Sequence, residues 1–253
     1  ITAAKRKVLD LAIRGKLVPQ DPADEPASEL LKRIAAKRET QVSTDRRSRS
    51  KGSSVIFRGA DRSAYETCDG KTVCIDDEIP FDIPDSWAWA RLGSVSDYGK
   101  CVSVSTDQLS ADTWSLDLEE IAKETGRLIE RKTIGEKVST SAKHVFKKGM
   151  VLYSKLRTYL NKVMVADMDG VCTSEIIPIS LEGGILPEYL RNVLMSSYFL
   201  SYTAIRDYGV KMPRIGTEDA RKALIPIPPF AEQKRIVAKV EKVRNLIELT
   251  TRT

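Results

Sequence analysis

The last quarter of the chain changes its hydrophobic pattern abruptly at a run of prolines. Residues 224–227 are apolar and predict a short strand. Pro228 and Pro229 follow, and a proline suits the first turn of a helix and pushes the residue before it toward extended geometry. Apolar residues then recur at spacings of four and three, at Ile236, Val240, Val243, Ile247 and Thr250. The pattern predicts a helix with a narrow apolar seam, which needs a partner helix.

The N-terminal residues predict two helices. The first covers residues 2–13 and ends before Gly15, with one apolar face formed by Ala4, Val8, Leu11 and Ala12. Prolines at 19, 22 and 26 prevent a helix until Ala27 or Ser28. Ser28 is a candidate cap for a second helix that runs to around Lys37 or beyond.

The middle of the chain favours short strands. From Trp89 to Pro228, β-branched runs are broken by Gly, Asp and Ser. Residues 151–153, 162–166 and 176–179 are predicted strands, residues 187–202 predict one or two helices, and no internal repeat is visible. We therefore predict a mixed α/β (α+β) fold with one globular domain between helical segments.

Residues 41–54 are rich in Ser, Arg and Lys and lack bulky apolar side chains. Such a segment cannot bury itself, which favours a basic linker. The alternative is an arm that binds phosphate groups, and composition alone leaves both open.

Three stretches of the sequence resemble the specificity subunits of type I restriction-modification systems. Residues 224–241 match the family's hinge, an apolar I-P-(I/L)-P-P run followed by E-Q-(K/R)-x-I-V. Residues 4–20 with 25–31 are similar to the segment before a recognition domain, and residues 83–93 are similar to the domain's usual opening. The match covers both ends of the chain and the entry to its middle.

The resemblance implies a division of the chain into four parts. These are a helical segment at 1–40, a basic linker and entry segment at 41–82, a target-recognition domain at 83–228 and a coiled-coil helix at 229–253. It also implies that the long helices form an antiparallel coiled coil. Complete subunits of the family carry two recognition domains, so we expect this chain to be a half subunit or a fragment.

Composition narrows the class of protein further. A hydrophobic fraction of 42% without an apolar run near 18 residues argues against a membrane span, and no secretory leader is visible, although the chain begins with Ile1. Cys68, Cys74, Cys101 and Cys172 form no CxxC pair, which favours free cytoplasmic thiols, and a single histidine, His144, argues against a metal site. The formal charge of +6 is compatible with a nucleic-acid partner.

Motifs for catalysis are not visible in the sequence. There is no glycine-rich nucleotide loop, and Ile227 stands where the Pro-Pro-aromatic motif of amino-methyltransferases requires a polar residue that accepts a hydrogen bond. We therefore predict no catalytic residue and no cofactor on this chain. The resemblance places S-adenosylmethionine, ATP and Mg²⁺ on partner subunits.

Three polar segments are candidates for DNA contact. They are residues 98–106, 153–162 and 208–216, and the candidate residues are Lys100, Ser103, Ser105, Lys155, Arg157, Tyr159, Asn161, Lys162, Lys211 and Arg214. Arginine suits guanine and asparagine suits adenine, whereas lysine, serine and tyrosine suit phosphates. A plain strand, core packing and an ordinary connection are the respective alternatives. Thr158 departs from the family's usual proline.

The resemblance implies a non-catalytic subunit that recognises one half of a bipartite DNA target. It would dock modification subunits, and through the complex restriction subunits, in the cytoplasm and without membrane contact. Two copies are predicted to pair through helices near 2–14 and 229–251, with Val8, Leu11, Ile236, Val240, Val243 and Ile247 at the interface. The alternative is an interaction scaffold, or a regulator that mimics a specificity subunit, without DNA sequence preference.

Overall fold

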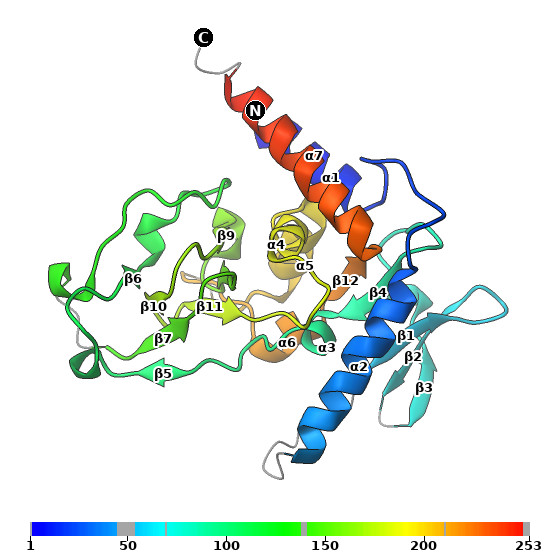
Figure 1. Cartoon of the computed structure of the whole chain (residues 1–253), viewed down its shortest axis with the longest axis horizontal. Coiled ribbons are helices and arrows are strands. Elements are labelled where there is room, and N and C mark those ends of the chain that lie inside the picture. The colour runs from blue at the N-terminus through cyan, green and yellow to red at the C-terminus, as the bar shows by residue number, and fades with distance from the viewer. Residues whose placement is uncertain (1, 45–53, 69, 138–140, 210, 250–253) are drawn as a thin grey trace.

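A computed structural model describes residues 2–44, 54–68, 70–137, 141–209 and 211–249. The fold is mixed α/β and has two hydrophobic cores (Figure 1). The larger core joins the helices to the central strands, and the smaller one lies in a β-rich lobe around Trp114, Phe146 and Ile176. None of the described helices is long and apolar enough to cross a membrane.

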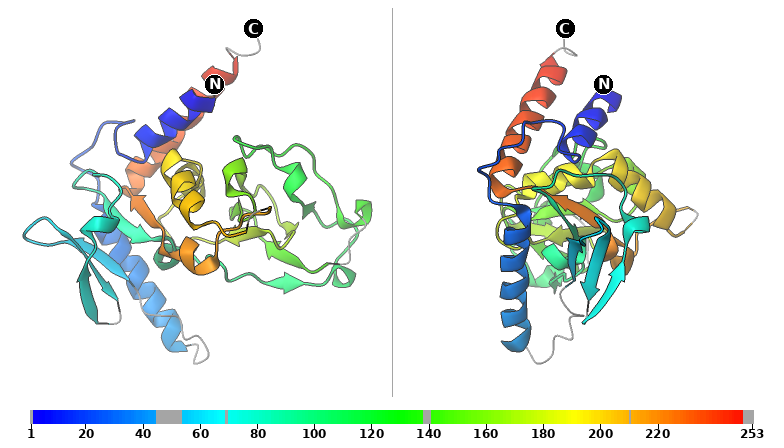
Figure 2. Two further views of the ribbon diagram at one scale, coloured as in Figure 1. Left: turned by 180° about the vertical axis from the view of Figure 1, so that it is seen from behind. Right: turned by 90° about the vertical axis from the view of Figure 1, so that its right-hand side faces the viewer.

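Two helices from opposite ends of the chain lie side by side. Helix α1 (Thr2–Ala12) and helix α7 (Phe230–Leu249) run antiparallel, with both termini at the same end of the molecule (Figure 2). Ile236 and Val240 are fully buried in the larger core, whereas Val8, Leu11, Val243 and Ile247 are half-buried. The predicted partner for the α7 seam is thus supplied in part by α1 and α4 (Pro187–Leu194) of the same chain. Thr250 lies outside the described residues.

The second helix begins and ends differently from the prediction. Helix α2 spans Ala27–Thr44, so Ser28 lies inside its first turn and is not the cap. The Ala27 amide donates to the Ser86 carbonyl, and the Glu29 amide donates to the Pro26 carbonyl, which gives these orphan amides partners. The helix also takes up the start of the predicted 41–54 linker, and residues 45–53 lie outside the described part.

The strand before α7 pairs with a strand near the start of the predicted recognition domain. Strand β12 (Leu224–Ile227) lies antiparallel to β4 (Ala88–Arg91), with Pro226 opposite Trp89. This pair continues into α3 (Leu92–Val95) on one side and into α7 on the other. Segments more than 130 positions apart in sequence therefore meet in one ladder.

The predicted central strands and helices are confirmed. Strand β8 (Val151–Ser154) lies between β11 (Ile176–Ile179) and β9 (Val163–Val165) in an antiparallel sheet, and every β8 residue is buried. The predicted helical region forms α4 and α5 (Ser197–Arg206), which break where the Ser196 hydroxyl accepts the Phe199 amide.

The β-rich lobe is built on a four-stranded sheet. Its order is β5 (Ser103–Val104), β7 (Lys143–Phe146), β10 (Gly170–Cys172) and β6 (Ser115–Leu116), of which β10 and β6 are parallel. Helix α6 (Thr217–Lys222) packs against α3 beside this lobe. Strand β5 confirms the strand interpretation of part of residues 98–106.

A three-stranded antiparallel sheet replaces most of the predicted entry segment. Strands β1 (Val55–Arg58), β2 (Ala64–Cys68) and β3 (Lys71–Cys74) form it, and Gly70 adopts a φ of 75° between the last two. Ile56 packs against the larger core, and Glu66 pairs with Arg91 at 2.7 Å. The sequence pattern gave no strand prediction for residues 55–74, which follow the predicted basic linker at 41–54.

Candidate nucleic-acid interface

The candidate segment 153–162 forms a tight turn at the end of β8. A single 3₁₀ turn covers Thr158–Leu160, and the two flanking residues, Arg157 and Asn161, have left-handed backbones with φ of 50° and 51°. Left-handed backbone disfavours residues other than glycine and asparagine by roughly 1 kcal/mol. The turn therefore persists because its surroundings hold it.

The candidate loop 208–216 docks directly on this turn. Tyr208 and Arg214 exchange two backbone hydrogen bonds of 2.9 Å, which close the loop. The Arg157 amide donates to the Pro213 carbonyl at 2.8 Å, and the Ile215 amide donates to the Lys155 carbonyl at 3.2 Å. Two segments about fifty positions apart in sequence thus form one surface.

The third candidate segment lies against the first, where the ring centroids of Tyr98 and Tyr153 are 6.3 Å apart, and against the start of α6. A Cβ added at Gly99, whose φ is 85°, would overlap the Thr217 methyl group at the start of α6. Burial raises the pKa of the Cys101 thiol, and the nearby Lys155 ammonium partly offsets this rise. The structure therefore brings the beginning of this segment to Lys155, and exposed Ser103 and Ser105 follow on and just after β5.

Several cations on this surface have no ion pair with any residue that the structure describes. Lys100, Arg157 and Lys211 are exposed, and Lys155 is half-buried. Tyr159 is 56% exposed beside Arg157, and Tyr208 is 60% exposed at the base of the loop. The surface therefore combines free positive charge with aromatic rings, a combination suited to a polyanion with stacked bases.

Arg214 is already engaged within the chain. Its guanidinium binds both carboxylate oxygens of Glu175, the shortest contact being 2.8 Å. These hydrogen bonds hold the pKa of the Glu175 carboxyl below its usual value. Arg214 thus holds the 208–216 loop against Glu175, which directly precedes β11. The carboxylate largely neutralises the positive charge of Arg214.

The side chains of two predicted contact residues are engaged within the chain. Asn161 is 3% exposed and its Nδ2 donates to the Met195 carbonyl at 3.1 Å. The Lys162 ammonium donates to the Leu118 carbonyl at 2.6 Å, and burial lowers its pKa. Neither side chain reaches the surface formed by Arg157 and Lys211, so the structure corrects both assignments.

Thr158 makes a contact that a proline could not make. Its hydroxyl donates to the Asp207 carboxylate at 2.5 Å, which ties the turn to the end of α5. Burial raises the pKa of Asp207 even though the hydroxyl donates to it. Sequence reasoning gave no role to Asp207 or to Arg206 before it, although both stand at the end of a predicted helical region beside a candidate loop.

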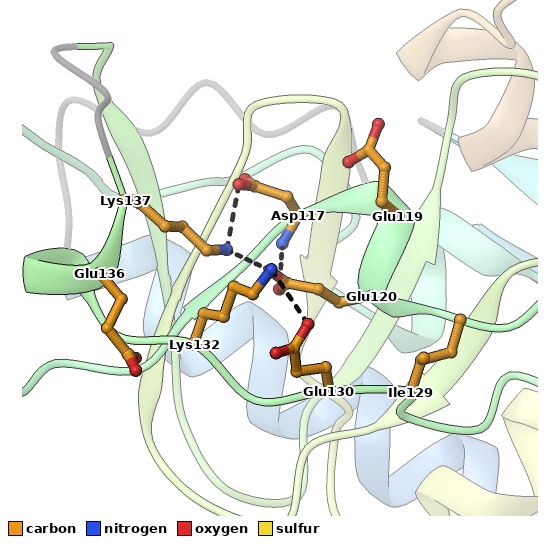
Figure 3. Close-up of a pocket in the computed structure, with 8 residues that line it drawn as sticks. All are labelled: Asp117, Glu119, Glu120, Ile129, Glu130, Lys132, Glu136 and Lys137. Carbon is orange, nitrogen blue, oxygen red and sulfur yellow. Dashed lines mark hydrogen bonds and ion pairs between the residues drawn. The ribbon is translucent and has the colours of Figure 1, made fainter.

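A pocket in the β-rich lobe is acidic. It has a volume of about 390 Å³ and is lined by Asp117, Glu119, Glu120, Ile129, Glu130, Lys132, Glu136 and Lys137 (Figure 3). The Lys137 ammonium contacts Asp117 at 3.0 Å and Glu120 at 2.6 Å, and buried Lys143 contacts Asp117 at 3.0 Å. These pairs stabilise the lobe, and the surplus of carboxylates makes the pocket unsuitable for phosphates.

Other polar clusters do not point to a catalytic or metal centre. Among the residues that the structure describes, no three His, Cys, Asp or Glu side chains are grouped to hold a metal ion. His144 lies on β7 with its Nδ1 3.0 Å from the Ile176 carbonyl oxygen. The side chain is half-buried on this strand.

The three stretches that carry the family resemblance meet at one junction. The Trp87 indole donates to Glu232 at 2.8 Å, and the Gln20 amide donates to the other oxygen of Glu232 at 2.6 Å. Gly15 has a φ of 67°, and a Cβ there would overlap Pro84. The motifs therefore serve packing between the helices and the recognition domain.

Comparison with known proteins agrees with this architecture. The family model described as "Type I restriction modification DNA specificity domain" matches residues 84–253. The specificity subunit of the type I restriction enzyme EcoDI of Escherichia coli is 32% identical over 166 residues, which are 66% of this chain and 36% of that protein. The EcoAI specificity subunit of Escherichia coli is 26% identical over an alignment of 255 positions, which covers 96% of this chain and 40% of that protein.

Solved structures show the same relationship. The HsdS subunit of Thermoanaerobacter tengcongensis aligns with a TM-score of 0.58 and 27% identity over 69% of this chain and 46% of that one. A chain from a structural study of complex assembly and conformational transition of the type I R-M system aligns with a TM-score of 0.57 and 28% identity, over 68% of this chain and 46% of that one. This chain matches less than half of the length of each of these relatives. Because the family model covers more than half of its residues, the chain belongs to the type I restriction-modification DNA specificity domain family.

Proposed function

We propose that this chain recognises a DNA sequence for a type I restriction-modification complex. The observation that carries the proposal is the joined surface of the 153–162 turn and the 208–216 loop, where the guanidinium of Arg157 is exposed and unpaired among the described residues. A free guanidinium can bind the O6 and N7 atoms of guanine with two hydrogen bonds. Membership of the specificity family supports the same function.

Different residues of this surface are assigned different roles. Arg157 contacts a base edge, and Tyr159 lies against the sugar or a base. Lys100, Lys155, Lys211 and Arg206 contact phosphates, and Ser103 and Ser105 reach base edges or phosphates. Arg214 positions the loop through Glu175, because its donors are already bound there.

The helices on either side are assigned to assembly. We propose that residues 83–228 form the target-recognition domain, and that residues 1–40 and 229–253 dock modification subunits, with restriction subunits joining through the complex in the cytoplasm. The chain is then non-catalytic, with S-adenosylmethionine, ATP and Mg²⁺ on its partners. The antiparallel arrangement of α1 and α7 supports a longer coiled coil with a second recognition domain.

A pair of two copies would recognise a DNA target made of two separated half-sites. Protein two-fold symmetry imposes symmetry on the half-sites and fixes their separation. One chain therefore reads one half of a bipartite sequence. We assign Val8, Leu11, Val243 and Ile247 to the extended helical interface, since these side chains are only half-buried in one chain.

Two measurements test the function. Mapping methylated adenines in DNA from cells that contain this chain and its partners gives the target and the half-site spacing. A salt-dependent gel shift with that target and a scrambled competitor then measures sequence preference. An interaction scaffold, or a regulator that mimics a specificity subunit, predicts equal binding of both duplexes, and that result would reject the proposal.

A further inference from the structure

A short loop connects the β-rich lobe to the helices. Residues 122–127 form a compact turn in which the Ala122 amide donates to the Arg127 carbonyl and the Gly126 amide donates to the Ala122 carbonyl. Glu124 and Gly126 have left-handed backbones with φ of 62° and 64°. A Cβ at Gly126 would overlap the Val163 carbonyl oxygen, so the loop lies directly against β9.

Arginines from two helices bind one carbonyl of this loop. The Thr125 oxygen accepts a hydrogen bond of 2.7 Å from Arg191 of α4 and one of 3.1 Å from Arg244 of α7. Arg191 also donates to the Val163 carbonyl at 3.3 Å. Glu241 pairs with both guanidinium groups, at 3.5 Å and 3.3 Å, which offsets their mutual repulsion.

A charged residue of α1 also binds the 122–127 loop. Arg6 of α1 contacts the Glu124 carboxylate at 2.6 Å, so three helices hold the loop. Burial lowers the pKa of Arg191 to about 10, and the neighbouring Arg244 adds to this effect. Arg191 nevertheless remains protonated at neutral pH, and its donors are directed to backbone oxygens.

The other side of the loop holds the candidate DNA-contact turn. The Glu124 amide donates to the Leu160 carbonyl at 3.1 Å, and the Leu160 amide donates to the Arg157 carbonyl at 2.9 Å. Only these backbone contacts separate the loop from the residue assigned to base recognition. A continuous series of hydrogen bonds thus runs from α4 and α7 to Arg157.

We propose that Arg191 and Arg244 are positioning residues for DNA recognition, which act through the 122–127 loop on the Arg157 turn. The proposal rests on the proposed function of that turn. The turn needs such support because Arg157 has a left-handed backbone, which disfavours residues other than glycine and asparagine. The loop fixes the place of Arg157 relative to the helices, and with it the direction in which the guanidinium meets a base.

Hydrogen–deuterium exchange of the full chain without DNA tests the first half of the proposal. We expect Arg244→Ala to speed exchange of the amides in 157–161 by roughly tenfold, since the loop loses one of its two charge-assisted hydrogen bonds to the Thr125 carbonyl. Lys242→Ala is the matched control, because it removes the same charge from an exposed position of the same helix. Arg244→Lys, which keeps a cationic donor, should restore part of the protection.

A second variant moves the loop without changing a charge. Gly126→Ala places a methyl group against the Val163 carbonyl, whereas Gly149→Ala has the same left-handed backbone, with φ of 86°, and open space around it. We expect only Gly126→Ala to speed exchange at 157–161. Equal acceleration over the whole chain, or none at 157–161 in both test variants, would overturn the proposal.

Binding to the mapped target tests the second half. Arg244→Ala and Gly126→Ala should lower the ratio of target to competitor affinity by about five- to tenfold, while the two controls keep the wild-type ratio. An unchanged ratio despite faster exchange at 157–161 would also overturn the proposal. Equal binding of target and competitor by the wild-type protein would instead reject the proposed function. The exchange experiment would still decide whether the 122–127 loop holds the Arg157 turn.

Discussion

The indole Nε1 of Trp87 lies 2.8 Å from Oε2 of Glu232, which joins the opening of the recognition domain to the first turn of α7. Glu232 is fully buried, and burial raises the pKa of its carboxyl even though Trp87 and Gln20 donate to it. Its replacement by alanine leaves the Trp87 indole without its acceptor and removes the shorter of the two hydrogen bonds that the Gln20 amide donates. Glu232 therefore has a larger role in stability than its charge suggests.

Glu232→Ala is expected to lower the free energy of unfolding by about 1–3 kcal/mol, because a buried donor loses its partner. Glu232→Gln should cost less, since a side-chain oxygen still faces the indole. Urea denaturation followed by tryptophan fluorescence measures both. Lys239→Ala, exposed on the same helix, is the control, and equal effects of Lys239→Ala and Glu232→Ala would contradict the assignment.

Arg157 is expected to lower the stability of the fold and to contribute to DNA recognition. Arg157→Gly should be more stable than Arg157→Ala by about 1 kcal/mol, because glycine tolerates the φ of 50°. Both variants should lose roughly 1–3 kcal/mol of discrimination at one position of the target. Thermal unfolding and competition gel shifts separate the two effects, and unchanged discrimination in both variants would move base recognition elsewhere.

Lys211 is expected to contribute equally to the binding of any DNA sequence. Lys211→Ala should weaken binding to target and competitor alike and reduce the salt slope by about 1, as for the loss of one phosphate contact. The measurement is binding affinity at several salt concentrations. A loss confined to the target would show that Lys211 contacts a base.

The β-rich lobe should become less stable at acidic pH. Burial alone would raise the pKa of Asp117, but hydrogen bonds from Lys137 and Lys143 outweigh it and hold the pKa below its usual value. A carboxyl with a lowered folded pKa stabilises above its unfolded pKa, and this contribution is lost as the pH falls through the folded value.

The corresponding test is urea denaturation between about pH 5 and pH 2. Stability of the wild type should fall over this range, and Asp117→Asn should show a smaller fall from a lower starting value. Glu119 lines the same pocket but is not among the ion-pair partners of Lys137 and Lys143 in the described part of the chain, so Glu119→Gln should leave the pH dependence of stability unchanged. Identical pH profiles for wild type and Asp117→Asn would contradict this account.

Pairing of two copies should depend on the outer end of α7. Leu249 is 64% exposed in the single chain, so Leu249→Glu should leave monomer stability unchanged. We expect light scattering to show a concentration-dependent dimer for the wild type and a weaker one for Leu249→Glu. A wild-type monomer at high concentration, with both helices intact, would reject the dimer.

The local pattern of hydrophobic and polar residues was sufficient to predict many elements of the fold. The proline run at 228–229 predicted the strand-to-helix change, and β-branched runs predicted β8, β9 and β11. It was insufficient for β1, β2 and β3, because a composition rich in Ser, Arg and Lys at 41–54 masked the short apolar run that follows. Ser28 failed as a cap because the chain entering α2 is fixed by Ser86, a residue far away in sequence.

The sequence by itself determined the family, the mixed α/β class and the segments that could meet DNA, because motif order, hydrophobic period and residue chemistry are local properties. Tertiary structure alone decided which candidates share a surface. It joined Arg157 to the 208–216 loop, buried Asn161, turned Lys162 toward Leu118 and paired Arg214 with Glu175. The reason is physical: solvent exposure and ion pairing depend on neighbours from distant parts of the chain, which no local pattern specifies.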